Sequence, residues 1–352
     1  MEIIRIRLKS FFVKLAVAVT AVFLIMMRED IGDKISDALT MCGDTLIPTL
    51  FPFMVLSSFA LSYGIFEKET KIASFVMNRI FRLPIAAVSA VIFGFAGGYP
   101  VGARVICKLY EKGSISREDA KHLFAFCING GPAFIISFAG EIISGSEDVG
   151  YIIFVSVFIS SLMTGIVYSR IKKKNSIAEL KTDRTDQSIS SSVVFSVTDA
   201  TGGIISVCAW VIMFMVFSAV VAYFVNNEML LKIYLSVAEI TSGLEYSLSV
   251  GGIPFAAACI ASGGISVFCQ VLPAIKKCGI KVYEYLFFRI INSITVYCVT
   301  SLLIKIFDVT IPVVSEFDAQ LHFAPASAAL LIMCAVLIFD VVSDNERQNI
   351  FG

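Results

Sequence analysis

The sequence predicts an all-α, polytopic membrane protein with about eight transmembrane helices plus two re-entrant helical hairpins in inverted repeat. Hydrophobic residues make up 57% of the 352 residues and charged residues 16%, whereas soluble domains average about 45–50% and about 25%. About eight apolar runs approach the ~20 residues that cross a hydrocarbon core. Two further apolar segments are interrupted by glycine, proline or serine.

The chain divides into five expected regions. The first, 1–45, is a retained signal-anchor helix and an external amphipathic segment, because basic residues precede an apolar run without a small-x-small cleavage site. Two repeats follow, 46–170 with hairpin 116–143 and 193–307 with hairpin 253–275. A polar linker, 171–192, separates them, and 308–352 holds a last span and a tail. The expected spans are 11–27, 46–66, 84–106, 151–168, 204–225, 230–249, 282–307 and 324–342.

Lysine and arginine placement predicts the orientation in the membrane. Basic residues at the N-terminus, after the second span and in the linker 171–192 place these three regions in the cytoplasm. The basic loop 107–121 would then lie outside, against the same rule, so its side is left open.

Each half carries two glycine-rich interruptions: 94–100 and 127–134 in the first half, 239–245 and 259–268 in the second. Paired in this order, they predict two inverted copies that meet near the bilayer midplane. Unwound backbone is tolerated there only if it is buried in protein or faces a cavity. Helix N-termini at the breaks would favour an anion by about 0.3–1 kcal/mol each. The pattern predicts a small-solute transporter.

The candidate substrate-binding residues lie at these interruptions. Arg104 lies within an apolar stretch, where an arginine costs at least about 2.5–3.5 kcal/mol, so it either faces a cavity or snorkels to the interface. Glu239 has the same two interpretations, and Asp199 is expected at the interface. The glycines could instead pack helices closely, Tyr99 could be a membrane anchor, and the other polar residues could cap helices. The candidates are Gly97, Gly98, Tyr99, Pro100, Gly102, Arg104, Asn129, Gly130, Gly131, Glu239, Thr241, Ser242, Ser262, Gly263, Gly264 and Gln270.

Other functional classes find little support in the sequence. GxSxG, HExxH and P-loop motifs are absent, so an enzyme is not expected and no catalytic residue is assigned. Nine cysteines without CxxC spacing and two histidines predict no metal site. No cofactor is expected, although a coupling ion, Na+ or H+, is left open. The zero formal net charge gives no reason to expect a nucleic-acid partner.

Three short motifs carry a resemblance to a known family: Gly-Tyr-Pro-Val-Gly-Ala at 98–103, Ile-Ser-Arg-Glu-Asp-Ala at 115–120 and Asn-Gly-Gly-Pro at 129–132. Over 46–307 the chain resembles the YlbJ-type sporulation integral membrane proteins, which carry duplicated nucleoside-recognition, or Gate, domains. The resemblance implies transport of dipicolinic acid during endospore formation, by alternating access at a midplane site. It also implies a multi-pass protein of the bacterial cytoplasmic membrane, with the outer forespore membrane as one location.

Two alternatives to dipicolinate transport are retained. One is an ion-coupled nucleoside transporter, since Gate domains also occur in such proteins. The other is a non-transporting membrane scaffold for spore maturation. The expected partners are a small-molecule substrate, foremost dipicolinate, the lipid bilayer, and a second copy of the chain or other sporulation membrane proteins.

Overall fold

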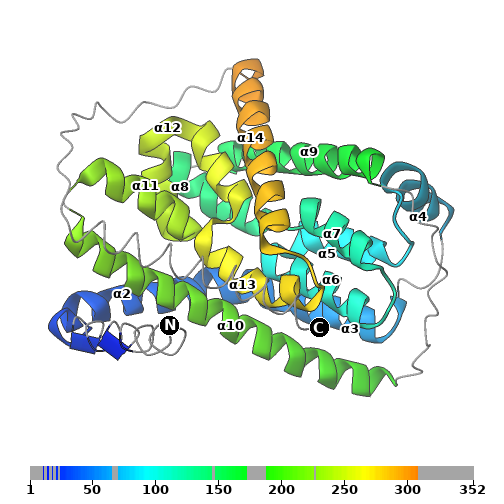
Figure 1. Cartoon of the computed structure of the whole chain (residues 1–352), viewed down its shortest axis with the longest axis horizontal. Helices are drawn as coiled ribbons and strands as arrows, with labels where there is room; N and C mark the ends of the chain where they lie inside the picture. Colours follow the sequence, from blue (N-terminus) through cyan, green and yellow to red (C-terminus); the bar gives the residue numbers. More distant parts are fainter. Residues whose placement is uncertain are drawn as a thin grey trace, which may run out of the picture.

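The protein is built from helices throughout the part of the chain that the structure describes. This computed structural model describes residues 24–65, 70–144, 147–172, 188–225 and 227–307, with residues 11, 14, 15, 18, 21 and 22. All regular elements within these ranges are helical (Figure 1). Five helical stretches are long and apolar enough to cross a membrane: Arg28–Ser62, Glu147–Ile171, Ile189–Phe224, Tyr246–Lys277 and Val282–Ile306. The predicted class, an all-α multi-pass membrane protein, is confirmed.

The first half contains both long helices and short broken ones. Its elements are α2 (Arg28–Met41), η1 (Cys42–Leu46), α3 (Ile47–Ser62), α4 (Lys71–Phe75), η3 (Val76–Phe81), α5 (Ala87–Gly97), α6 (Tyr99–Glu111), α7 (Arg117–Phe126), η4 (Ala133–Ala139), α8 (Gly140–Ser144) and α9 (Glu147–Ile171). The second half has α10 (Ile189–Phe224), α11 (Glu228–Ala238), α12 (Ile240–Ser262), α13 (Gly264–Lys277) and α14 (Val282–Ile306).

Two of the expected spans are not continuous helices. The segment 84–106 is divided at Gly98, whose φ of 85° favours glycine and ends α5 before α6 begins. The segment 230–249 is divided at Glu239, which has extended backbone dihedrals between α11 and α12. The span expected at 204–225 begins earlier, at Ile189, where the Ser188 hydroxyl caps α10. The span 324–342, seven residues of 11–27 and the linker residues 173–187 lie outside the described residues.

Both predicted hairpin segments are interrupted helices. In 116–143, α7 ends at Phe126 and the next helix begins at Ala133. In 253–275, α12 ends at Ser262, and Gly263, in the left-handed region, precedes α13. Gly251 and Gly252 add a kink within α12. Their depth in a bilayer, and hence their re-entrant character, stays a prediction.

The repeat has a different register from the one expected. In each half a glycine with positive φ separates two helices, a glycine turn follows the second helix, and a capping box starts a third. These positions are Gly98, Gly113 and Ser116–Asp119 in the first half, and Gly263, Gly279 and Lys281–Glu284 in the second. Thus α5–α6–α7 corresponds to α12–α13–α14. This register differs from the expected pairing of 127–134 with 259–268, which rested on glycine content.

The two halves interlock around a shared core. Helix α3 packs along α10, and α6 packs against α13 (Figure 1). The repeat-related turns are tied by two ion pairs, Lys121 with Glu284 at 2.5 Å and Lys277 with Glu111 at 3.0 Å. Large apolar side chains on α9, α10 and α14, such as Ile205 at 62% exposure and Ile294 at 60%, present the surface that contacts the lipid bilayer. The breaks at Gly98, 127–131, Glu239 and Gly263 are buried, whereas the kink at Gly251 is exposed.

Candidate substrate site at the helix breaks

A small cavity lies where the breaks of the two halves meet. Its volume is about 50 Å³. One water needs at least about 10–15 Å³ by a comparable measure, so this space holds a few water molecules. Helices α3, α6, α10, α12 and α13 contribute to its wall, together with the break after α7. The lining residues are Leu46, Thr49, Leu50, Gly98, Tyr99, Pro100, Gly131, Phe134, Val207, Val211, Glu239, Ile240, Thr241, Val267 and Gln270.

The first turns of three helices line this cavity. Helix α6 begins at Tyr99, the helical stretch Ala133–Ser144 begins just after Pro132, and α12 begins at Ile240. Tyr99, Phe134 and Thr241, one from each first turn, belong to the wall. A helix N-terminus carries about half a positive charge and N–H groups without an intrahelical acceptor. The backbone therefore makes the cavity favourable for a negatively charged group.

Glu239 is the charged residue among the described residues that line the cavity. It is only 3% exposed and lies in the break between α11 and α12. Its carboxylate accepts a hydrogen bond from the Thr241 hydroxyl, and its backbone carbonyl accepts one from the Gly243 N–H. A carboxylate next to the start of α12 is stabilised by that helix dipole. The protein thus supplies one negative charge of its own at the site.

Glycines bring the first break against the hairpin 116–143. A Cβ on Gly94 would lie 2.4 Å from the carbonyl oxygen of Cys127, and one on Gly102 would lie 2.8 Å from the same oxygen. A Cβ on Gly98 would lie 3.1 Å from the backbone nitrogen of Gly131. These three glycines, spaced four residues apart on either side of and at the break between α5 and α6, allow the backbones to touch. The close packing of this break against residues 127–131, and the cavity beside it, therefore both depend on these three glycines.

We expect Gly94→Ala to destabilise the protein by about 1–3 kcal/mol and to reduce transport, because a backbone oxygen cannot move aside as a side chain can. Unfolding in detergent and solute flux would both be measured. Gly202→Ala on α10 is the matched control, since a Cβ there meets nothing within 4 Å. Equal unfolding midpoints for Gly94→Ala and the unmodified protein would contradict the role of this contact.

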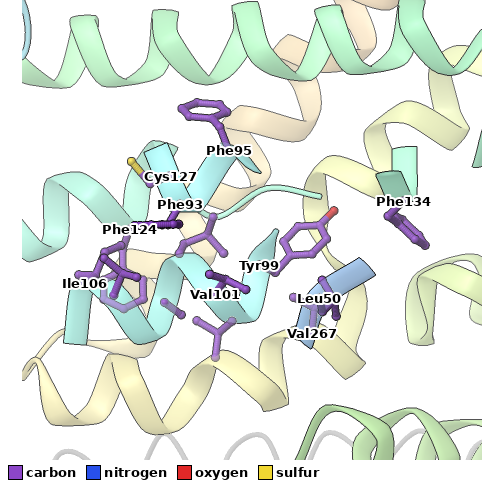
Figure 2. Packing of buried hydrophobic residues seen from close by; sticks show 14 of the residues in the cluster. Leu50, Phe93, Phe95, Tyr99, Val101, Ile106, Phe124, Cys127, Phe134 and Val267 are labelled. Carbon is purple, nitrogen blue, oxygen red and sulfur yellow. The ribbon is translucent and has the colours of Figure 1, made fainter. Parts of the chain in front are cut away.

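Tyr99 ties the two halves together beside the cavity. It is 6% exposed, and its hydroxyl donates to the carbonyl of Ile260 near the end of α12. Figure 2 shows its ring near Leu50 of α3 and Val267 of α13. Tyr99 is therefore part of the cavity wall and is buried between helices, whereas a membrane-anchoring tyrosine would lie at the lipid interface.

Two predicted polar residues, Asn129 and Ser262, cap helix ends at the breaks. Asn129 is fully buried; its amide nitrogen donates to Phe126 O at 2.7 Å, and its amide oxygen accepts from the Ser161 hydroxyl at 2.9 Å. Ser262 donates to Cys259 O at 2.7 Å and accepts from the Gly264 N–H at 3.2 Å. These side chains hold the ends of α7 and α12, which makes them structural supports of the site.

The structure brings part of the predicted set together. Seven predicted residues line the cavity: Gly98, Tyr99, Pro100, Gly131, Glu239, Thr241 and Gln270. Ser262 and Gly264 line a second, mostly apolar cavity of about 410 Å³ between α12, α13 and α14. Six others line neither cavity: Gly97, Gly102, Arg104, Asn129, Gly130 and Gly263. The Ser242 side chain lies outside the described part of the chain.

Arg104 points to an acidic partner outside the cavity. Its Nη2 lies 2.6 Å from the carboxylate of Asp199 on α10 and 2.7 Å from the backbone carbonyl of the same residue. Lys108, one turn further along α6, lies 2.5 Å from the same carboxylate. Asp199 is therefore engaged between helices, and its expected position at the membrane interface stays a prediction.

Arg289 is a central residue that the sequence reasoning missed. It is 3% exposed and donates to carbonyl oxygens at the ends of two helices. The acceptors are Phe124, Ala125 and Ile128 at the end of α7, and Ala261 at the end of α12. Its guanidinium also lies 5.4 Å from the Tyr285 ring centre. A lone arginine in the first third of the apolar helix α14 was the available signal.

Comparison with known proteins supports the expected resemblance. The chain is similar to the sporulation integral membrane protein YlbJ of Bacillus subtilis (strain 168), with 26% identity over 136 residues. The match covers 39% of this chain and 33% of YlbJ, so the similar region spans about a third of that relative's length. No protein-family model matches the chain. No solved structure matches it either. The chain is a multi-pass integral membrane protein similar to YlbJ over that region.

Proposed function

We propose that this protein transports a small organic anion across the membrane through the cavity at the helix breaks. The observation that carries the proposal is the convergence of three helix first turns on one buried cavity where the two halves meet. Broken backbone at membrane depth is tolerated where it faces a cavity or water, and helix N-termini at such breaks are suited to anionic groups. The proposal concerns transport, and no catalytic step is assigned.

Dipicolinate is the first candidate cargo. It is a planar aromatic dicarboxylate, so each carboxylate can accept N–H groups from a helix first turn. Similarity to a sporulation membrane protein supports a role during endospore formation, in the bacterial cytoplasmic membrane or the outer forespore membrane. Loss of the gene should then lower the dipicolinate content of spores.

The cavity must widen before a dicarboxylate can enter. Its present volume of about 50 Å³ has room for only a few waters, which is less than a dicarboxylate needs. Widening at the breaks, where α6, α12 and α13 meet without continuous backbone hydrogen bonding, would expose the cavity alternately to each side. Tyr99 and the glycines around Cys127 lie at the contacts that would have to change.

A second candidate cargo is a neutral nucleoside, moved together with Na+ or H+. Glu239 supports this alternative, because a buried carboxylate attracts hydroxyl and amino donors or a cation and repels an anion. Thr241 and Gln270 add uncharged hydrogen-bonding groups to the same wall.

Flux into proteoliposomes separates these functions. The purified full chain would be reconstituted, and uptake of radiolabelled dipicolinate and of uridine would be compared with empty liposomes. The proposal predicts dipicolinate uptake that saturates with concentration. Uridine uptake alone would support the nucleoside alternative. Movement of neither solute, at neutral pH and with imposed Na+ or H+ gradients, would leave a scaffold function in place of transport.

A further inference from the structure

A cluster of charged side chains lies between α3, α6 and α10, outside the cavity. One carboxylate oxygen of Asp199 accepts hydrogen bonds from Arg104 Nη2 at 2.6 Å, Lys108 Nζ at 2.5 Å and Ser58 Oγ at 2.9 Å. Lys108 also donates to Ser58 at 2.8 Å. Charge-assisted hydrogen bonds of this length are among the strongest in proteins. Donors from two helices therefore surround the position of a single carboxylate.

The cluster has more positive than negative charge. Two cations share the one carboxylate, and the side chains of Arg104, Lys108 and Asp199 are 27%, 22% and 23% exposed. The Lys108 ammonium also lies 5.5 Å from the centre of the Phe195 ring, a further favourable contact for a cation. Burial reduces solvent screening, so the net positive charge attracts anions more strongly than an exposed pair would.

The backbone of α10 leaves space for the guanidinium. A Cβ on Gly203 would lie 1.7 Å from Arg104 Nη1 and 2.6 Å from Arg104 Cζ. The sulfur of Met54 would be 3.1 Å from that Cβ, so the guanidinium lies in a narrow space between α3 and α10. The missing side chain of Gly203 leaves room for the Arg104 guanidinium between α3 and α10. In this position the guanidinium can donate both to Asp199 and to a second acceptor.

The cluster lies on the same three helices as the cavity. Each helix has a residue that lines the cavity. One and two turns away on the same helix lie residues that either belong to the charged cluster or pack against it. The successions are Leu50, Met54 and Ser58 on α3; Pro100, Arg104 and Lys108 on α6; and Val207, Gly203 and Asp199 on α10. One to two turns correspond to about 6–12 Å along a helix. An anion at the cluster would need only a short movement along these helices to reach the cavity.

We propose that Ser58, Arg104 and Lys108 form an outer anion site, at which a solute carboxylate replaces that of Asp199 before the solute enters the cavity. This inference rests on the proposed transport of an organic anion. Exchange of one carboxylate for another keeps the charge balance and the hydrogen bonds of both cations. Displacement of the Asp199 carboxylate also removes its links from α10 to Ser58 on α3 and Lys108 on α6, while Arg104 can still donate to the Asp199 backbone carbonyl.

Binding of dipicolinate to the detergent-solubilised full chain, measured by titration calorimetry, tests this inference. Asp199→Asn removes the internal competitor and should tighten binding about tenfold or more. Asp37→Asn is the matched control, because it makes the same substitution in an exposed ion pair with Lys34 on α2, outside the cluster. Unchanged or weaker binding by a folded Asp199→Asn protein would overturn the outer site.

A second variant decides the matter even if Asp199→Asn does not fold. The charge-balanced pair Arg104→Met with Asp199→Asn removes both the competitor and the guanidinium. Binding about tenfold weaker than in the unmodified protein is expected, whereas unchanged binding would show that the solute uses only the cavity. Absence of dipicolinate uptake by the unmodified protein in liposomes would instead refute the transport function itself.

Discussion

Arg289→Met is expected to lower the free energy of unfolding by about 3–5 kcal/mol, the range typical for removing one partner of a buried charged contact. The guanidinium satisfies carbonyl oxygens at the ends of α7 and α12, and each buried acceptor left without a donor costs about 1–3 kcal/mol. The two helix C-termini also supply about half a negative charge each, which together balance one arginine. Unfolding in detergent, followed by circular dichroism, measures the loss.

Two further variants define the role of Arg289. Lys305→Met removes the same charge from an exposed position on α14 and should change stability little. Arg289→Lys keeps the charge but loses the planar fork that reaches both helix ends, so an intermediate loss is expected. If Arg289→Met unfolds at the same midpoint as Lys305→Met, the carbonyl contacts do not hold the two breaks together.

Glu239→Gln should change the affinity for the two candidate cargoes in opposite directions. For dipicolinate bound in the cavity that Glu239 lines, the repulsion removed is that of a neighbouring charge, about 4 kcal/mol at ~4 Å and an effective dielectric constant of ~20, so binding should tighten by more than tenfold. For uridine, loss of the charged acceptor should weaken binding. The substituted glutamine side chain keeps an oxygen that can accept from the Thr241 hydroxyl, which limits structural change.

Calorimetric titration of both solutes measures this effect, and Glu141→Gln is the control because Glu141 is an exposed carboxylate at the start of α8. Weaker dipicolinate binding by Glu239→Gln would argue against an anion in this cavity. Unchanged affinity for both solutes would remove Glu239 from the substrate site.

The class of protein and the positions of the breaks were predictable from local sequence. Apolar runs and the Gly98 and Gly263 interruptions act through backbone preferences that a few neighbouring residues determine. The register of the repeat was also within reach. Capping residues at Ser116–Asp119 and Lys281–Glu284 mark equivalent helix starts more specifically than glycine content does.

The partners of the charged side chains were beyond sequence reasoning. Arg104 meets Asp199 95 residues away, and Arg289 reaches carbonyl groups of Ala125 164 residues away. Such contacts depend on how the halves dock, which no local pattern encodes. For this reason the sequence placed Arg104, Asn129 and Glu239 in one binding set. In the structure, Arg104 belongs to a charged cluster, Asn129 caps a helix, and Glu239 lines the cavity.

The most direct test of a transport site at the helix breaks is an experimental structure of the full chain with dipicolinate bound. We expect the solute between the first turns of α6 and α12, in contact with Tyr99 and Thr241 and close to Gly131, with the cavity larger than its present 50 Å³. A solute bound elsewhere, such as between α12, α13 and α14, with the volume of this cavity unchanged, would contradict the central claim.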